Sequence, residues 1–230
     1  MNLSPYHAFA ACAVLEKRIR ELRDASAVPD DLFDAFEKYH YSLLHKLKSA
    51  RYHTQTLREY LSSGTAQTVA PADLVYRVNF HFDGFLHVVG SASDIFAREV
   101  LSYFAVAMPP KVYFGTAHAE LSAARPGDAI LPLLVTPPWR QEFADYRNTA
   151  THESLIAASY TVKVDMKGAT ASKRLVFPVP DDPRATVPTT TKNTDIAEYC
   201  ERTLKRVVSH FNKAYTHIAM RAKTSGSLPL

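Results

Sequence analysis

Residues 72–106 read ADLVYRVNFHFDGFLHVVGSASDIFAREVLSYFAV, and this stretch decides the fold. Apolar side chains recur in it at helical spacing. Those on the apolar side are Val78, Phe82, Phe85, Val89, Ala92, Phe96 and Val100. Pro109-Pro110 would stop the helix, because proline disfavours helical backbone in the residue before it. The pattern therefore predicts one long helix from about Ala72 to Val106.

A second long helix is predicted immediately upstream. Pro29-Asp30-Asp31 supplies the proline and the first-turn acids typical of a helix start, and Gly64 marks the end. Between them runs one apolar stripe, made of Phe36, Leu43, Leu47, Ala50, Thr54, Leu57 and Leu61. We expect these two helices to form an antiparallel hairpin.

Shorter elements flank this hairpin on both sides. A first helix is predicted from Pro5 to Arg23, and a less regular stretch with Pro126-Gly127 and Pro137-Pro138 is expected before a fourth helix. That fourth helix opens near Trp139. Its predicted core side consists of Trp139, Phe143, Tyr146 and Ala150.

The last third of the chain changes character. Alternating apolar and polar residues between Ser159 and Pro180 predict a β-hairpin at about 159–178. Asp195, with Glu198 three residues later, forms a capping box that begins the last helix. The apolar side of this helix is predicted to hold Ile196, Cys200, Leu204, Val207, Phe211, Tyr215 and Ile218. We expect residues 224–230 to be a mobile tail.

Composition indicates one mainly α domain over residues 1–230, a helical bundle built on the long hairpin with a small β-hairpin insertion. Only 7 glycines punctuate the chain, whereas an all-β sandwich needs a turn signal every roughly 8–12 residues. The net charge of +4 and the pI near 9.0 permit a polyanionic partner without requiring one.

Cysteine usage and hydropathy bound the compartment. Cys12 and Cys200 lie far apart without a CxxC or Cys/His cluster, so we expect neither a disulfide framework nor a metal site. No apolar run approaches the roughly 18 residues of a membrane span, and the run from Ala8 to Leu15 is typical of an amphipathic helix rather than a signal peptide. We therefore expect a cytoplasmic protein that has no membrane partner and needs no cofactor.

The run with chemical content is Arg147-Asn148-Thr149-Ala150-Thr151-His152. In an α-helix each residue advances about 100°, so Arg147, Asn148, Thr151 and His152 fall within roughly 140° of one another. They form one polar face that points away from the predicted core side. Asn148 stands four residues before His152, close enough to orient its imidazole ring.

Arginine and histidine together suit the cleavage of a phosphodiester. A guanidinium can bind a phosphate through two hydrogen bonds, and a histidine can transfer a proton near neutral pH. RNA is the natural substrate, because its 2′-hydroxyl is an internal nucleophile and no metal is then required. The alternative is a solvated helix face, on which Arg147 pairs with an acid and His152 caps or packs.

This run resembles the motif of the HEPN superfamily. The motif consists of an arginine, a polar residue, three further residues and a histidine, on a late helix of an all-α domain. Members are commonly metal-independent endoribonucleases of toxin–antitoxin, anti-phage and RNA-processing systems, and they act as homodimers. The resemblance implies that Arg147 holds the scissile phosphate, Asn148 positions it or the histidine, and His152 is the general acid or base. It also implies a neutralising protein partner in a toxin setting. The β-hairpin departs from the family pattern.

Two further groups are candidates for RNA contact. Asp83 and His87, four apart on the long helix, are candidates for an auxiliary role at the site, although the sequence around His87 favours a hydrogen-bonded, partly buried side chain. The last helix carries a basic face that includes Arg202, Lys205, Arg206 and Lys213. This face would bind RNA or would simply be solvated surface.

Two classes of function therefore remain open from the sequence. The first is a HEPN-like metal-independent endoribonuclease, and the second is a non-catalytic helical module that binds a protein or a nucleic acid. The enzyme hypothesis predicts that the Arg147 and His152 side chains converge in an open cleft.

Overall fold

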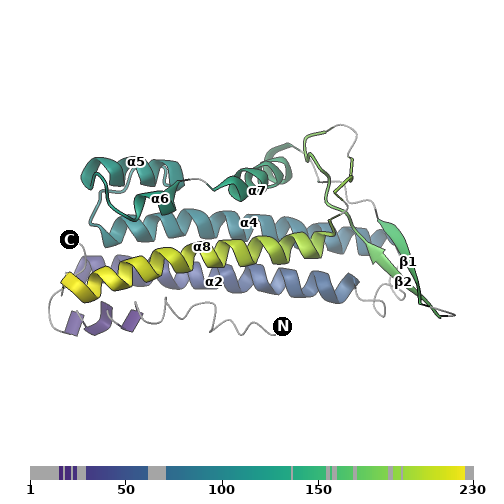
Figure 1. Cartoon of the computed structure of the whole chain (residues 1–230), viewed down its shortest axis with the longest axis horizontal. Coiled ribbons are helices and arrows are strands. Elements are labelled where there is room, and N and C mark those ends of the chain that lie inside the picture. The colour runs from purple at the N-terminus through teal and green to yellow at the C-terminus, as the bar shows by residue number, and fades with distance from the viewer. Residues whose placement is uncertain are drawn as a thin grey trace. The chain divides into compact units, whose positions relative to one another are not determined.

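The computed structural model describes residues 16–17, 19–21, 23–24, 30–61, 71–135, 137–153, 156, 160–167, 170–185, 189–192 and 194–225. The fold is mainly α, as the sequence predicts (Figure 1). The elements in chain order are α2 (Asp30–Leu61), α4 (Pro71–Tyr103), α5 (Phe114–Ala124), α6 (Leu131–Leu134), α7 (Pro138–Asn148), the π-helical turn η1 (Thr149–Glu153), β1 (Thr161–Lys167), β2 (Thr170–Val176) and α8 (Ile196–Ser225).

The chain forms two compact units, and each gathers separate segments of the sequence. The first unit combines Met1–Lys46, Ser91–Pro137 and Lys205–Leu230. The second combines Leu47–Gly90 and Pro138–Leu204. Each of the three long helices α2, α4 and α8 contributes one part to each unit. The single domain predicted over residues 1–230 stays a prediction.

The two predicted helices of the hairpin are confirmed in position and in the side they bury. Every residue of the apolar stripes predicted for α2 and α4 is buried. In α8 the predicted apolar side is buried except for Leu204, which is partly exposed. Large apolar side chains at regular helical spacing are thus sufficient to identify these three helices.

In the first unit, three helices meet at one buried carboxylate. Glu99 of α4 is completely buried, and its Oε1 lies 2.9 Å from Nδ1 of His40 in α2. The same oxygen accepts a hydrogen bond from the Tyr103 hydroxyl at 3.0 Å. Its Oε2 accepts one from the Tyr215 hydroxyl of α8 at 2.6 Å. The network therefore fixes which sides of α2, α4 and α8 face one another in this unit.

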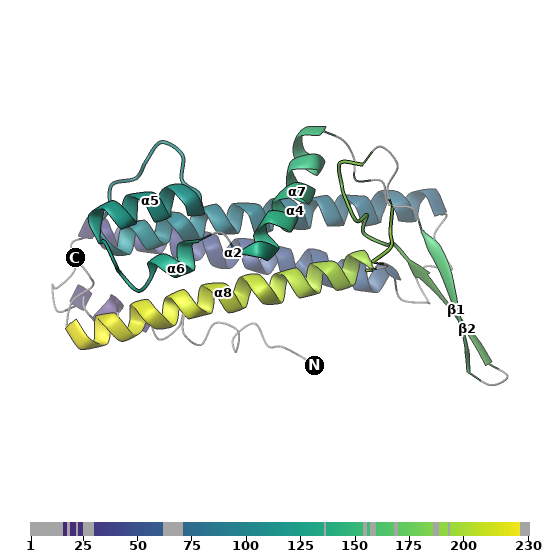
Figure 2. The same cartoon turned by 45° about the horizontal axis from the view of Figure 1, so that its top comes forward.

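Two helices occupy the stretch between residues 110 and 138, which the sequence analysis expected to be less regular. Helix α5 buries Phe114, Ala117 and Leu121, and the Phe114 ring lies 5.8 Å from that of Phe96 in α4. Figure 2 shows α5 and α6 side by side. The prediction failed here because alanines make up much of α5, so its apolar period is weak.

Helix α4 also ends earlier than predicted. It stops at Tyr103, and Ala105 adopts a left-handed backbone conformation with φ of 48°. The Val106 N–H donates to the Leu101 carbonyl at 3.0 Å, and the Ala105 N–H donates to that of Ser102 at 3.1 Å. These bonds form a Schellman motif with alanine in the place usually taken by glycine, so the sequence lacked the expected stop signal.

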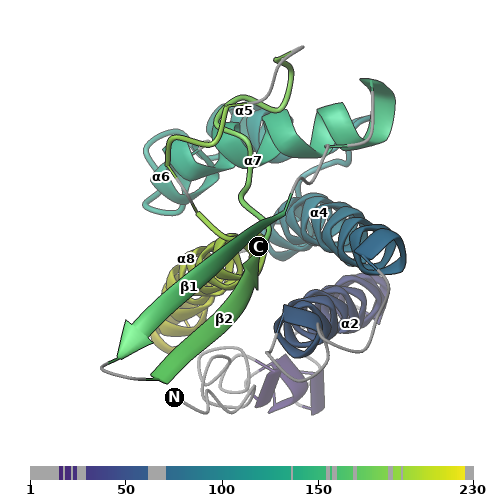
Figure 3. The same cartoon turned by 90° about the vertical axis from the view of Figure 1, so that its right-hand side faces the viewer.

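The predicted β-hairpin is confirmed as an antiparallel pair, β1 and β2, with Thr161 opposite Val176 and Lys167 opposite Thr170 (Figure 3). Asp195 precedes α8 as predicted, and its Oδ1 accepts a hydrogen bond from the Ala197 N–H at 2.9 Å. Its Oδ2 accepts one from the Phe177 N–H at 3.1 Å, so the same carboxylate also ties the residue after β2 to the start of α8.

Both ends of the chain are described only in part. Of the helix predicted from Pro5 to Arg23, residues 16–17, 19–21 and 23 are helical, as is Asp24, and the rest, including Cys12, lies outside the described residues. At the other end, Thr224 and Ser225 still belong to α8, so the prediction of a tail from residue 224 is wrong for these two residues. Residues 226–230 lie outside the described residues. Within the described part of the chain, no helix combines the length and apolarity needed to cross a membrane.

Replacing Glu99 by alanine is expected to lower the free energy of unfolding by about 3 kcal/mol or more, because three buried donor groups lose their acceptor. Urea unfolding followed by circular dichroism at neutral pH measures the change. Glu120→Ala, at an exposed glutamate of α5, is the matched control and should stay within about 0.5 kcal/mol of the parent. A loss below about 1 kcal/mol for Glu99→Ala would show that the network contributes little to stability.

Candidate functional site

The end of α7 is anchored by Tyr146. In the second unit its buried ring lies 6.4 Å from that of Phe82 in α4 and 5.1 Å from that of Tyr199 in α8. The Tyr146 hydroxyl donates a hydrogen bond to the Pro180 carbonyl. Burial raises the pKa of Tyr146, which keeps this hydroxyl a donor. These contacts fix the backbone from which Arg147 extends.

The side chain of Arg147 lies against Gly90 of α4. A Cβ atom at Gly90 would stand only 2.8 Å from the Arg147 Nε and 3.0 Å from its Cδ, so the contact requires glycine. The Nε is buried and has no hydrogen-bond partner among the described residues, and none of them forms an ion pair with Arg147. The expectation that this side chain points away from the core is therefore wrong for its inner part, which packs on α4.

A change of helix type divides the predicted motif. Helix α7 ends at Asn148, and Thr149–Glu153 form a π-helical turn. The α-helical spacing assumed from the sequence thus holds only as far as Asn148, which is half-buried. Single π-helical turns are rare and frequently lie at functional sites.

The residues of the π turn differ in how far they are buried. Thr149 is buried, and its hydroxyl has no hydrogen-bond partner among the described residues. Thr151 is exposed. The backbone of His152 belongs to the turn, but its side chain lies outside the described part of the structure. The convergence of Arg147 and His152 therefore stays a prediction.

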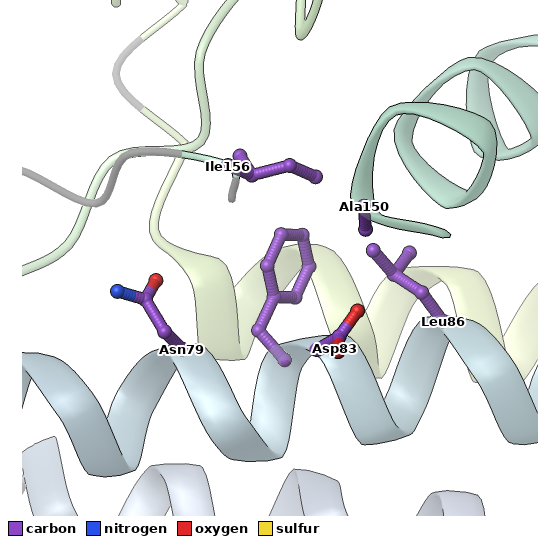
Figure 4. A pocket seen from close by; sticks show the side chains of 6 residues that line it. Asn79, Asp83, Leu86, Ala150 and Ile156 are labelled. Carbon is purple, nitrogen blue, oxygen red and sulfur yellow. The ribbon is translucent and has the colours of Figure 1, made fainter. Parts of the chain in front are cut away.

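A small recess joins the motif to α4 (Figure 4). Its lining consists of Asn79, Phe82, Asp83, Leu86, Ala150 and Ile156. The recess is about the size of one water molecule, so a nucleotide would have to lie over it rather than inside it. Asn79 is buried, and its Oδ1 has no partner among the described residues. The structure thus brings the auxiliary candidate Asp83 next to Ala150 of the motif run.

His87 lies on the same side of α4, between Asp83 and Gly90 in sequence. Its side chain is exposed and takes part in an interaction. The alternative in which His87 is partly buried is therefore wrong, although its auxiliary role stays a prediction.

The basic residues predicted on the last helix are divided between the units. Arg202 belongs to the second unit with Arg147, and its guanidinium lies 6.0 Å from the centre of the Tyr199 ring. Its Nε is buried without a hydrogen-bond partner among the described residues. The other three, Lys205, Arg206 and Lys213, belong to the first unit and are exposed. Lys205 also has a hydrogen bond or another electrostatic contact, so it is not simply solvated.

A histidine pair in the second unit was not predicted from the sequence. Nδ1 of His53 in α2 lies 3.0 Å from Nδ1 of His81 in α4. A Cβ atom at Gly84 would stand 2.5 Å from Cε1 of His53, so this contact also requires glycine. Glycines inside a helix usually have a packing reason, and Gly84 and Gly90 were the signals that could have predicted both contacts.

Burial lowers the pKa of both histidines, and the neighbouring His81 lowers that of His53 further. One ring must donate and the other accept in their hydrogen bond, so the folded pair cannot carry two protonated rings without losing this bond. In the described residues, no group of three or more His, Cys, Asp or Glu side chains could hold a metal ion.

In comparisons with known proteins, no family model, curated protein or solved structure matches the chain. The site is therefore interpreted from its own residues.

The histidine pair predicts a loss of stability in acid. Because the folded pKa values lie below the ordinary value near 6.5, the stability present above about pH 6.5 is lost progressively as the pH falls below that value and through the lower folded pKa values. Urea unfolding at about pH 8 and pH 5 measures this loss. It should be smaller in His53→Gln/His81→Gln than in the parent, whereas the half-buried His118→Gln should behave as the parent. An equal loss in the double variant would contradict the prediction.

Proposed function

We propose that this protein is a HEPN-like, metal-independent endoribonuclease. Arg147 holds the scissile phosphate, Asn148 positions that phosphate or the histidine, and His152 transfers the proton. The observation that supports this proposal is the contact of Arg147 with Gly90, at the junction of an α-helix with a π turn. A fixed arginine that none of the described residues pairs with is available to bind an anion.

The contact with Gly90 reduces the cost of binding a phosphate. A surface arginine loses rotamer freedom when it orders around a ligand, but the inner part of Arg147 is already held by the α4 backbone. A buried polar nitrogen without a partner also lowers stability, and such groups call for an explanation through a ligand or a catalytic role. Because the Nε faces α4, a phosphate would be held in a bidentate complex by the two Nη atoms of the guanidinium.

The wider proposal follows from the same resemblance. The protein acts as a cytoplasmic homodimer that brings two copies of the motif together, as a toxin or an anti-phage defence component held by a neutralising protein. Asp83 and His87 are auxiliary to the site. The residues proposed to contact RNA are Arg202, Lys205, Arg206 and Lys213.

Purified protein is expected to cleave mixed cellular RNA in the presence of a chelator. Loss of the general acid–base group should slow cleavage about 100-fold or more in His152→Ala, and Arg147→Ala should be similarly impaired. His118→Ala and Arg125→Ala, in the first unit, are the matched controls and should cleave as the parent does. Absence of cleavage by a folded, dimeric sample would favour the non-catalytic binding module.

Gly90→Ala tests the position of Arg147 without removing it. The new Cβ displaces the Arg147 Nε, so cleavage should fall about tenfold or more. Alanine is favoured over glycine inside a helix by about 1 kcal/mol, which offsets the cost of the displacement, so unfolding should be little changed. Gly115→Ala in α5 is the control. Full activity of Gly90→Ala would contradict the role given to this contact.

A further inference from the structure

An exposed stripe of side chains follows α4 through the second unit. Tyr76, Phe80, Asp83 and His87 succeed one another by four, three and four residues, which places them on one side of the helix. The Tyr76 side chain is 71% exposed and that of Phe80 is 60% exposed. Gly90, three residues further along α4, is in contact with the Arg147 side chain. The stripe therefore leads along one helix directly to the proposed phosphate site.

One arginine lies beside the two aromatic rings and a second lies beyond the far end of the stripe. The exposed Arg77 has its guanidinium 5.8 Å from the centre of the Tyr60 ring, which holds it beside the start of the stripe. Arg147 lies at the other end. At 1.5 Å per residue, the Cα atoms of Tyr76 and Phe80 are about 6 Å apart along the axis, and those of Phe80 and Gly90 about 15 Å apart. This length accommodates a few nucleotides.

We propose that this stripe binds an unpaired RNA strand, with bases stacked on Tyr76 and Phe80 and backbone phosphates held by Arg77 and Arg147. This inference rests on the proposed function and specifies its substrate as single-stranded RNA. Stacking on aromatic side chains together with contacts to phosphate is the usual way in which proteins bind single strands. In a duplex the base faces are hidden, so the two rings would have nothing to stack on.

Asp83 sets the path of the strand. Its exposed carboxylate lies between the rings and Gly90 and repels phosphate, so the sugar–phosphate backbone passes at a distance from it. The same carboxylate accepts hydrogen bonds, which suits the amino groups of bases and the 2′-hydroxyl that distinguishes RNA from DNA.

A protein partner fits this stripe less well. The centres of protein–protein interfaces are depleted of charged residues, whereas here Asp83 interrupts the stripe, Arg77 lies beside it and Arg147 lies beyond its end. Aromatic rings alternating with charged groups are better matched to a nucleic acid strand.

Fluorescence anisotropy with a labelled oligouridine and with a labelled RNA duplex of equal length tests the proposal. The full-length His152→Ala variant is used, so that the RNA stays intact. Adding Tyr76→Ala/Phe80→Ala should weaken binding of the single strand tenfold or more and leave binding of the duplex unchanged. The aromatic exchange Tyr76→Phe/Phe80→Tyr should retain binding. Tyr113→Ala, at an exposed tyrosine of the first unit, is the matched control.

The outcomes separate this inference from the proposed function. Unchanged affinity of the double alanine variant for the single strand would overturn the inference, even if the parent protein cleaves RNA. Binding that depends on the two rings in a protein that never cleaves RNA would support the inference and sink the ribonuclease proposal. A changed oligomeric state with unchanged RNA affinity would identify the stripe as a protein interface and overturn the inference.

Discussion

The buried carboxylate of Glu99 is the constraint on which the packing of the first unit depends. Desolvating a carboxylate costs several kcal/mol, and it is tolerated only when donors surround it. Those donors come from α2, α4 and α8, as His40, Tyr103 and Tyr215. Rotation of any of the three helices would leave a donor or the carboxylate unpaired. The apolar stripes bring the helices together, and the polar network selects one arrangement among the many that apolar contacts allow.

Close approach to glycine plays the corresponding part in the second unit. Gly84 and Gly90 each cost about 1 kcal/mol inside a helix, and each permits a side chain from a neighbouring element to lie on the α4 backbone. They are six residues apart, so they face directions about 120° apart. The exposed stripe of Tyr76, Phe80, Asp83 and His87 falls between these two directions. The positions of α2 and α7 thus determine which side of α4 stays accessible.

The parts of this fold that could be predicted are those encoded in large apolar side chains at a regular spacing, as in α2 and α4. Small or exceptional residues defeated the prediction elsewhere: alanines conceal the period of α5, and Ala105 ends α4 in a conformation usually given to glycine. Contacts between separate helices were harder still. Nothing in the local sequence around His53 or His81 indicates that their rings meet, and only the glycine opposite His53 suggested a close neighbour.

The π turn changes the geometry of the motif in a direction that favours the proposed chemistry. In an α-helix, positions 147 and 152 are five residues apart and lie about 140° from each other. A π turn closes hydrogen bonds between residues five apart, so backbone positions at that separation come closer to one direction. Because η1 begins at Thr149, π-helical geometry applies to part of the segment between positions 147 and 152 and reduces the angle between them. A phosphate held by Arg147 would then need a smaller excursion to reach a proton donor at position 152 than uninterrupted α-helical geometry would impose.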